Sequence, residues 1–222
     1  MKTVYVITHP EVVIDPKVPV PRWPLSEKGI ARMRGLLHAP WIKNVTAVYS
    51  SEEQKAVDGA QIIANYLGLK VVQMATLGEV DRSSTGYLPK EKHDRNARLL
   101  FELPHDRIEG WEPAIEAQYR MVTTVYRILE FDQTMGPIVI MTHGAVASFL
   151  MSHLKHRKIS ALDEPGIEGG GGVFAFEANS REILAEWHNI DVYAPARANP
   201  PQKPVPNVPL GGESNNISET RV

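Results

Sequence analysis

The segment Val4-Tyr5-Val6-Ile7-Thr8-His9-Pro10 decides the fold of this chain. Its short β-branched run predicts a buried strand that ends in a loop at His9-Pro10. A second run of the same kind, Ile138–Thr142, is followed directly by His143-Gly144. In open α/β sheets, ligands bind beyond the carboxyl ends of the strands. If both strands are parallel and central, the two imidazoles share one crevice; the alternative is that each histidine merely hydrogen-bonds to a neighbouring loop.

Helix and strand patterns alternate around these two runs. We expect helices that begin after Ser26 and that span residues 52–67, about 92–101, 112–131 and 144–154, with further strands at residues 46–49, 70–74, 173–177 and 183–188. Ser26 and Ser51 are the expected N-caps of the first two helices. Glu52 and Glu53 would lie at the positive end of the second helix dipole. This alternation predicts an α/β fold, a three-layer sandwich with a mostly parallel sheet.

Composition excludes several classes of function. The 222 residues are 43% hydrophobic and 23% charged, which is typical of a globular protein. Lys+Arg 24 against Asp+Glu 26 gives a net charge of -2, so nothing in the overall charge favours nucleic acid or an anionic membrane as a partner. The chain has no cysteine, which excludes thiol nucleophiles, disulfides and cysteine-ligated metals. No apolar run reaches the roughly 18 residues of a membrane span, and no signal peptide is evident, so we expect a cytoplasmic protein.

The composition changes after Tyr193. Residues 194–222 contain six prolines and few large apolar residues. Such a segment cannot bury a core, so we divide the chain into a domain at residues 1–193 and a proline-rich tail at residues 194–222. The oligomeric state is left open by the sequence, with a homo-oligomer to which the tail contributes as one option.

Five short segments, taken in order, carry a resemblance to a known family. They are Val4–Pro10, Pro24–Gly29, Val48–Ser51 with Lys55-Ala56, Leu77–Glu79 and Met141–Ala145. They resemble, respectively, the Arg-His-Gly strand, the LTxxG helix start, and the SSPLxRAxxTA, LxE and SHGG segments of the histidine phosphatase superfamily. The resemblance covers about residues 2–190 and implies the phosphoglycerate mutase-like fold.

The resemblance also implies a reaction. In this family the first histidine, matched by His9, attacks phosphorus and becomes a phosphohistidine. The second, matched by His143, donates to the phosphoryl oxygens, and a carboxylic acid, matched by Glu79, protonates the leaving oxygen. Positioning and electrostatic stabilisation carry such catalysis, so the resemblance implies no metal and no cofactor. A nucleophilic imidazole must be neutral, with its tautomer fixed by a hydrogen bond at the other nitrogen.

The departures from the family pattern fall on the phosphate clamp. Thr8 stands where the family has an arginine, and Lys55 stands where it has a second one; Pro10 replaces a glycine. A lysine is a mobile point charge and threonine is neutral, whereas arginine binds phosphate with a planar fork. Arg22 and Arg82 are the candidates to compensate, and we include Thr8 and Lys55 with them as candidate phosphate-binding residues.

Two functions therefore remain open at this stage. One is a metal-independent phosphohydrolase that acts on a small phosphomonoester; phosphoglycerate mutase activity is less favoured, since a bisphosphorylated intermediate needs more cations. The other is a catalytically degenerate protein that binds a phosphorylated ligand or partner without turnover. Restoring Thr8→Arg is expected to raise turnover if the site has room for the guanidinium.

Overall fold

The computed structural model describes residues 2–194. Strands β1 (Thr3–Thr8) and β4 (Ile138–Thr142) lie side by side inside a six-stranded sheet of order β3-β2-β4-β1-β5-β6. They run parallel, and Thr8 pairs with Thr142. The residues that follow them, His9 and His143, therefore leave the sheet at the same edge. The expectation that both strands are central and parallel is confirmed.

The sheet is parallel on one side and antiparallel on the other. Strands β2 (Ala47–Ser50) and β3 (Val71–Gln73) continue the parallel part beyond β4. Strand β5 (Gly172–Glu177) pairs antiparallel with β1, and β6 (Ile183–Asn189) pairs antiparallel with β5. Three of the five pairings are parallel, so the predicted mostly parallel sheet is confirmed, as is the hairpin formed by the last two strands.

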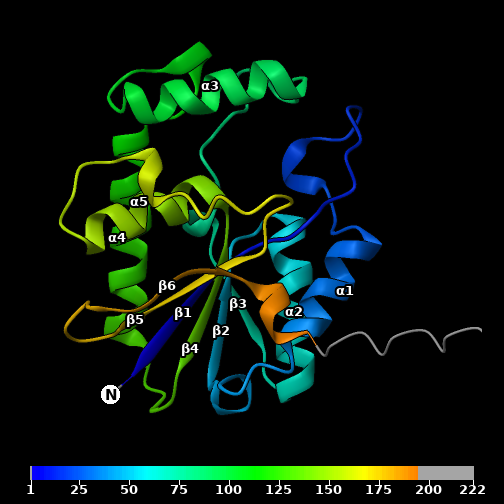
Figure 1. The fold of residues 1–222 in the computed structure, drawn as a ribbon, viewed down its shortest axis with the longest axis vertical. Helices are drawn as coiled ribbons and strands as arrows, with labels where there is room; N and C mark the ends of the chain where they lie inside the picture. The colour runs from blue at the N-terminus through cyan, green and yellow to red at the C-terminus, as the bar shows by residue number, and fades with distance from the viewer. Residues whose placement is uncertain (1, 195–222) are drawn as a thin grey trace, which may run out of the picture.

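Helices cover both faces of the sheet (Figure 1). On one face lie α1 (Glu27–Leu36) and α2 (Gln54–Leu67), and on the other lie α4 (Ala114–Phe131) and α5 (Gly144–Leu154). Helix α3 (Lys90–Glu102) crosses the end of the molecule at which β1 and β4 finish (Figure 1). The predicted three-layer sandwich is confirmed. Helix α3 covers the edge of the sheet from which the two histidines extend (Figure 1).

Side chains of the central strands alternate between the two faces. Val4 and Val6 belong to the core beneath α4 and α5, whereas Ile7 belongs to the core beneath α1 and α2. Ile140 and Met141 divide in the same way. Because successive side chains of a strand point to opposite faces, a strand with two buried faces must be apolar throughout. This is why both runs read as continuous hydrophobic segments.

The two expected N-caps have different outcomes. The Ser26 side chain accepts a hydrogen bond from the backbone N–H of Gly29, so this cap is confirmed. The expected cap at Ser51 is wrong: α2 begins at Gln54, its N-cap residue is Glu53, and no side chain caps it. The Ser51 hydroxyl lies instead 2.7 Å from Nε2 of His143. The same hydroxyl accepts from the Glu53 backbone N–H at 3.3 Å, so it joins a local contact to one that is distant in the sequence.

No helix within residues 2–194 is long and apolar enough to cross a membrane. The predicted tail at residues 194–222 lies, except for Ala194, outside the residues that the structure describes.

Candidate active site

His9 is held in a single tautomer by its own loop. Its backbone N–H donates to the Thr142 carbonyl, 3.1 Å away, which ties it to the end of β4. Nδ1 lies 2.9 Å from the Pro10 carbonyl oxygen. A carbonyl can only accept, so Nδ1 carries the proton and Nε2 keeps its lone pair. Burial lowers the pKa of His9 to about 4, and the ring is therefore neutral near neutral pH.

His143 is fully buried and packs against His9. The two rings meet edge to face with their centroids 5.2 Å apart. Nε2 of His143 contacts the Ser51 hydroxyl and lies 3.4 Å from Oε1 of Glu53. Nδ1 is buried and has no hydrogen-bond partner among residues 2–194. Burial holds the pKa of His143 well below its ordinary value, so this second imidazole is neutral too.

The Glu79 carboxylate is bound at the N-terminus of α5, the helix that begins directly after His143. Its carboxylate accepts hydrogen bonds from the backbone N–H groups of Val80 at 2.9 Å, Ala145 at 3.2 Å and Val146 at 3.4 Å. The first N–H groups of a helix lack partners within the helix and favour a negative charge. Arg120 donates to the Glu79 carbonyl, 3.2 Å away, and so holds the backbone from the other side. Glu79 and His143 are thus positioned by the same helix terminus.

A cavity of about 600 Å³ lies beside these groups. Its polar lining includes Thr8, His9, Glu79, Arg82, His93 and Glu164. Its apolar lining includes Val80, Ala97, Leu100, Phe101, Trp111 and Ile167. Ala97, Leu100 and Phe101 come from α3, which therefore forms part of the wall. Such a concave, mostly apolar site with a few convergent polar groups is typical of small-molecule binding.

The four candidate phosphate-binding residues lie in different surroundings. Thr8 lines the cavity, but its hydroxyl accepts from the Gly172 backbone N–H at 2.9 Å. Arg82 lines it too, donates to His93 and lies over the Trp111 ring, 5.4 Å from its centroid.

The other two candidates do not line the cavity that contains His9. Lys55 is buried, forms an ion pair with Glu53 and donates to the Val20 carbonyl at 3.1 Å. Arg22 lines an adjoining cavity of about 950 Å³, which shares Glu79 and Arg82 with the first. The structure therefore brings Arg82 and Thr8 together with the catalytic candidates and leaves Arg22 in the neighbouring space.

Glu53 is the site residue that sequence reasoning missed. Its carboxylate pairs with Lys55, accepts from the Glu79 backbone N–H at 2.8 Å and reaches His143. Burial opposes ionisation of this group, but the contacts with His143 and Lys55 prevail and lower its pKa to about 2. From the sequence, Glu53 was only an acidic residue at the beginning of a helix. No local signal indicates that three separate segments meet at its carboxylate.

The glycine run at residues 169–172 lies against the loop that carries His9. Gly170 has a φ of +71°, and a Cβ there would lie 2.3 Å from the His9 carbonyl oxygen. The Gly171 N–H donates to that same oxygen at 3.2 Å. Arg32 donates to the Gly170 carbonyl at 3.0 Å and pairs with Glu11. The run is therefore packed against the backbone of His9, where only glycine fits.

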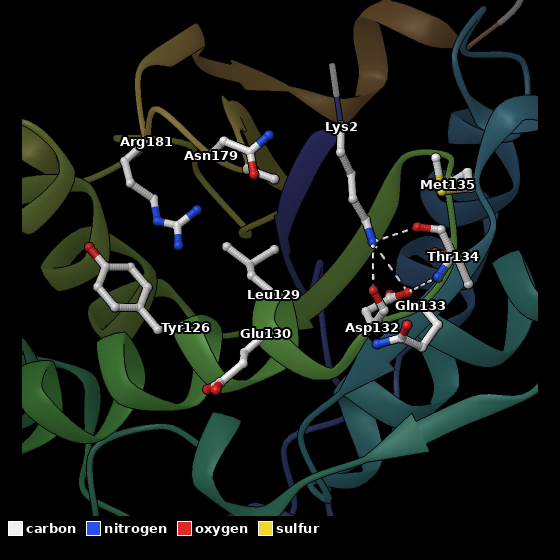
Figure 2. A pocket seen from close by; sticks show the side chains of 11 residues that line it. Lys2, Tyr126, Leu129, Glu130, Asp132, Gln133, Thr134, Met135, Asn179 and Arg181 are labelled. Carbon is white, nitrogen blue, oxygen red and sulfur yellow. Dashed lines mark hydrogen bonds and ion pairs between the residues drawn. The ribbon is translucent and has the colours of Figure 1, made fainter.

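A further cavity of about 630 Å³ lies at the other end of the sheet (Figure 2). Lys2, Asp132 and Asn179 line it, next to the beginnings of β1 and β4 and the end of β5. Lys2 is paired with Asp132 at 3.2 Å and donates to the Thr134 carbonyl (Figure 2). None of the seven candidate residues from the sequence lines this cavity. The cavity that His9 and Glu79 line is therefore the candidate active site.

In the described part of the chain, no cluster of three or more His, Cys, Asp or Glu side chains is arranged to hold a metal ion.

Comparison with known proteins agrees with this geometry. The family model described as histidine phosphatase superfamily (branch 1) matches residues 20–191. The match begins after His9, so it does not test the role predicted for His9. A comparison with curated proteins finds no match.

Solved structures share the fold. YhfR of Bacillus stearothermophilus has a TM-score of 0.66 at 20% identity, over 83% of this chain and 95% of its own. A mycobacterial glucosyl-3-phosphoglycerate phosphatase has a TM-score of 0.65 at 18% identity, over 85% and 96%. A phosphoglycerate mutase from Bacillus anthracis has a TM-score of 0.64 at 18% identity, over 86% and 95%. At these identities the likeness establishes the fold, and the expected phosphoglycerate mutase-like architecture is confirmed.

Proposed function

Since the chain belongs to the histidine phosphatase superfamily, we propose that it is a metal-independent phosphohydrolase that acts on a small phosphomonoester through a phosphohistidine at His9. The observation that carries the proposal is the hydrogen bond from Nδ1 of His9 to the Pro10 carbonyl. This bond leaves the lone pair of Nε2 available in a ring that burial keeps neutral. The cytoplasm as location, and a small phosphorylated molecule rather than nucleic acid or a membrane as partner, belong to the same proposal.

The proposed reaction has two steps. Nε2 of His9 attacks phosphorus and the bond from phosphorus to the leaving oxygen breaks. Glu79, which must first take up a proton against the three N–H groups that stabilise its carboxylate, gives that proton to the leaving oxygen. Water then attacks the phosphohistidine and gives a proton to the Glu79 carboxylate, the bond from phosphorus to Nε2 breaks, and inorganic phosphate leaves while His9 recovers its lone pair and Glu79 its proton. His143 would stabilise the charge on the phosphoryl oxygens, since it lies against His9 and its Nδ1 has no other partner among the described residues.

Hydrolysis is favoured over a mutase reaction because few cationic side chains at the site are free to bind phosphate. A mutase must retain a bisphosphorylated intermediate, which requires several free cationic groups. Lys55 is already paired with Glu53, and the Thr8 hydroxyl is already bonded to Gly172. Arg82 is the cation that lines the cavity next to His9.

The same observations favour a second candidate function. A protein of this fold that has lost efficient chemistry would bind a phosphorylated ligand without turnover. The ion pair between Lys55 and Glu53 supports this alternative, because it neutralises the lysine that stands at the family's arginine position.

Hydrolysis of a panel of phosphomonoesters in the presence of a chelator separates the two. The comparison uses the native protein, His9→Ala and the matched control His105→Ala, which removes an exposed histidine. Turnover that disappears in His9→Ala and persists in His105→Ala supports the phosphohydrolase. No turnover with any ester, or turnover indifferent to His9, would exclude it and leave the binding function.

A further inference from the structure

The charges around the two histidines differ from those expected of a site for a doubly charged anion. Arg82 and Glu79 line the cavity with His9, and the ion pair of Lys55 with Glu53 lies beside His143, with Oε1 of Glu53 3.4 Å from Nε2 of that histidine. Two more carboxylates, those of Glu164 and Glu168, line the same cavity. Both imidazoles are neutral. The described side chains around the cavity therefore sum to no net positive charge.

The carboxylate of Glu53 is held in place beside His143 by contacts at both of its oxygens. One of its oxygens accepts from the Glu79 N–H, and the other is paired with Lys55. It stays ionised at any ordinary pH, since its pKa is about 2. An anion bound between His9 and His143 would lie near this fixed charge, because Oε1 of Glu53 is 3.4 Å from Nε2 of His143.

We propose that the site selects a phosphoryl group with a single negative charge, and that Glu53 is the residue that imposes this selection. The inference rests on the proposed function, which it deepens by naming the substrate class. Two kinds of ligand carry that charge: a phosphomonoester with one protonated oxygen, and a phosphodiester. A second charge on the phosphoryl group would meet the carboxylate of Glu53 and those that line the cavity. Lys55 is already paired, so Arg82 is the one cation among the described lining residues that could offset it.

The pH dependence of inorganic phosphate binding tests this selection without requiring turnover. Inorganic phosphate gains its second charge within the interval from about pH 5.5 to about pH 8, and a phosphomonoester gains it at about pH 6, within the same interval. Over this range His9, His143 and Glu53 do not titrate.

Other groups also face the cavity and must be controlled. Burial lowers the pKa of His93 and raises that of Glu164, while Lys55 and Arg82 are the nearby cations. Glu53→Gln keeps an oxygen that can accept from the Glu79 N–H, and it also frees Lys55 from its ion pair. The matched control is Glu52→Gln, which removes the adjacent, exposed carboxylate.

Calorimetric titration with inorganic phosphate is expected to show a Kd that rises at least about tenfold from pH 5.5 to pH 8 for the native protein and for Glu52→Gln. In Glu53→Gln this rise should largely disappear, with tighter binding at pH 8. An equal rise in Glu53→Gln and the native protein overturns the role of Glu53. A native Kd that does not rise with pH overturns the selection itself, and needs no variant that might misfold.

Turnover distinguishes the two ligand sources. At pH 8, hydrolysis of bis(4-nitrophenyl) phosphate in preference to 4-nitrophenyl phosphate supports the selection and identifies the diester as the source. Monoester hydrolysis whose kcat/KM falls as pH rises supports it and identifies the protonated monoester. A monoester kcat/KM that does not fall between pH 5.5 and pH 8 contradicts the inference while leaving the phosphohydrolase intact.

Discussion

The imidazole rings of His9 and His143 meet edge to face with their centroids 5.2 Å apart. They are far apart in the sequence. The register of β1 with β4, in which Thr8 pairs with Thr142, brings them together. Two charged imidazoles at this separation would repel one another, and burial makes the charged form costlier still. Burial therefore favours the neutral form of each ring, which is the state in which His9 can act as a nucleophile.

An arginine at position 8, where the family has one, should raise turnover and lower the stability of the fold. Thr8→Arg should raise turnover of a phosphomonoester, because Thr8 lines the cavity beside His9 and a guanidinium there would bind the phosphoryl oxygens. It should also lower the free energy of unfolding by about 1–3 kcal/mol, since the buried N–H of Gly172 loses its acceptor. Thr8→Val is the control: it shares the loss of stability without the gain in turnover. Turnover of Thr8→Arg below that of Thr8→Val would mean that the cavity cannot accommodate the guanidinium.

Stability should depend on pH through His9, which is partly buried, and His143, which is buried. The pKa of His9 is about 4 in the folded protein, against an ordinary value of 6.5. Between these values the unfolded chain binds a proton that the folded chain does not, so the free energy of unfolding falls as pH falls from about 6.5 to about 4. Each pKa unit corresponds to about 1.4 kcal/mol. Glu53, with a pKa lowered from 4.5 to about 2, contributes a further loss only at more acidic pH.

Urea denaturation at about pH 7 and about pH 5 measures this effect, since that interval lies inside the titration window of a buried histidine. The decrease in unfolding free energy should be smaller in His9→Ala than in the native protein. His105→Ala, which removes an exposed histidine, should behave like the native protein. Equal decreases in all three would show that His9 titrates normally in the folded state and that burial does not hold it neutral.

The glycine loop offers a test of how His9 is positioned. Gly170→Ala should lower both stability and turnover, because its Cβ would lie 2.3 Å from the His9 carbonyl oxygen and the backbone of His9 would have to move. Gly166→Ala is a matched control: its φ is also positive, at +58°, but nothing lies within 4 Å of the added carbon. We expect it to cost only the backbone strain, of order 1 kcal/mol. Equal losses of turnover in the two variants would mean that the contact with His9 does not matter.

The parts of the structure that follow from local patterns were predictable. Two continuous apolar runs identified the central strands, because strands buried on both faces carry no polar positions, and the histidines that follow marked the ligand-binding edge. Ser26 was predictable as a cap, since it bonds within its own helix turn. These features depend on residues that are neighbours in the sequence.

The parts that depend on distant contacts were not predictable. Ser51 has the residue type and position of an N-cap, yet its hydroxyl bonds to His143, on an element far along the chain. Glu53 suits a helix dipole equally well, and nothing near it in the sequence shows that its carboxylate joins Lys55, Glu79 and His143. In the same way, the glycine run cannot be interpreted without knowing that Gly170 lies against His9.

The central claim is that His9 becomes phosphorylated during turnover, and one measurement addresses it directly. The native protein and His9→Ala are mixed with an excess of phosphomonoester, quenched in alkali to preserve the acid-labile bond between nitrogen and phosphorus, and mapped by peptide mass spectrometry. Our account predicts a phosphate on the peptide that contains His9 in the native protein, and none in His9→Ala. Turnover without phosphate on His9, or phosphate on another residue, would contradict it.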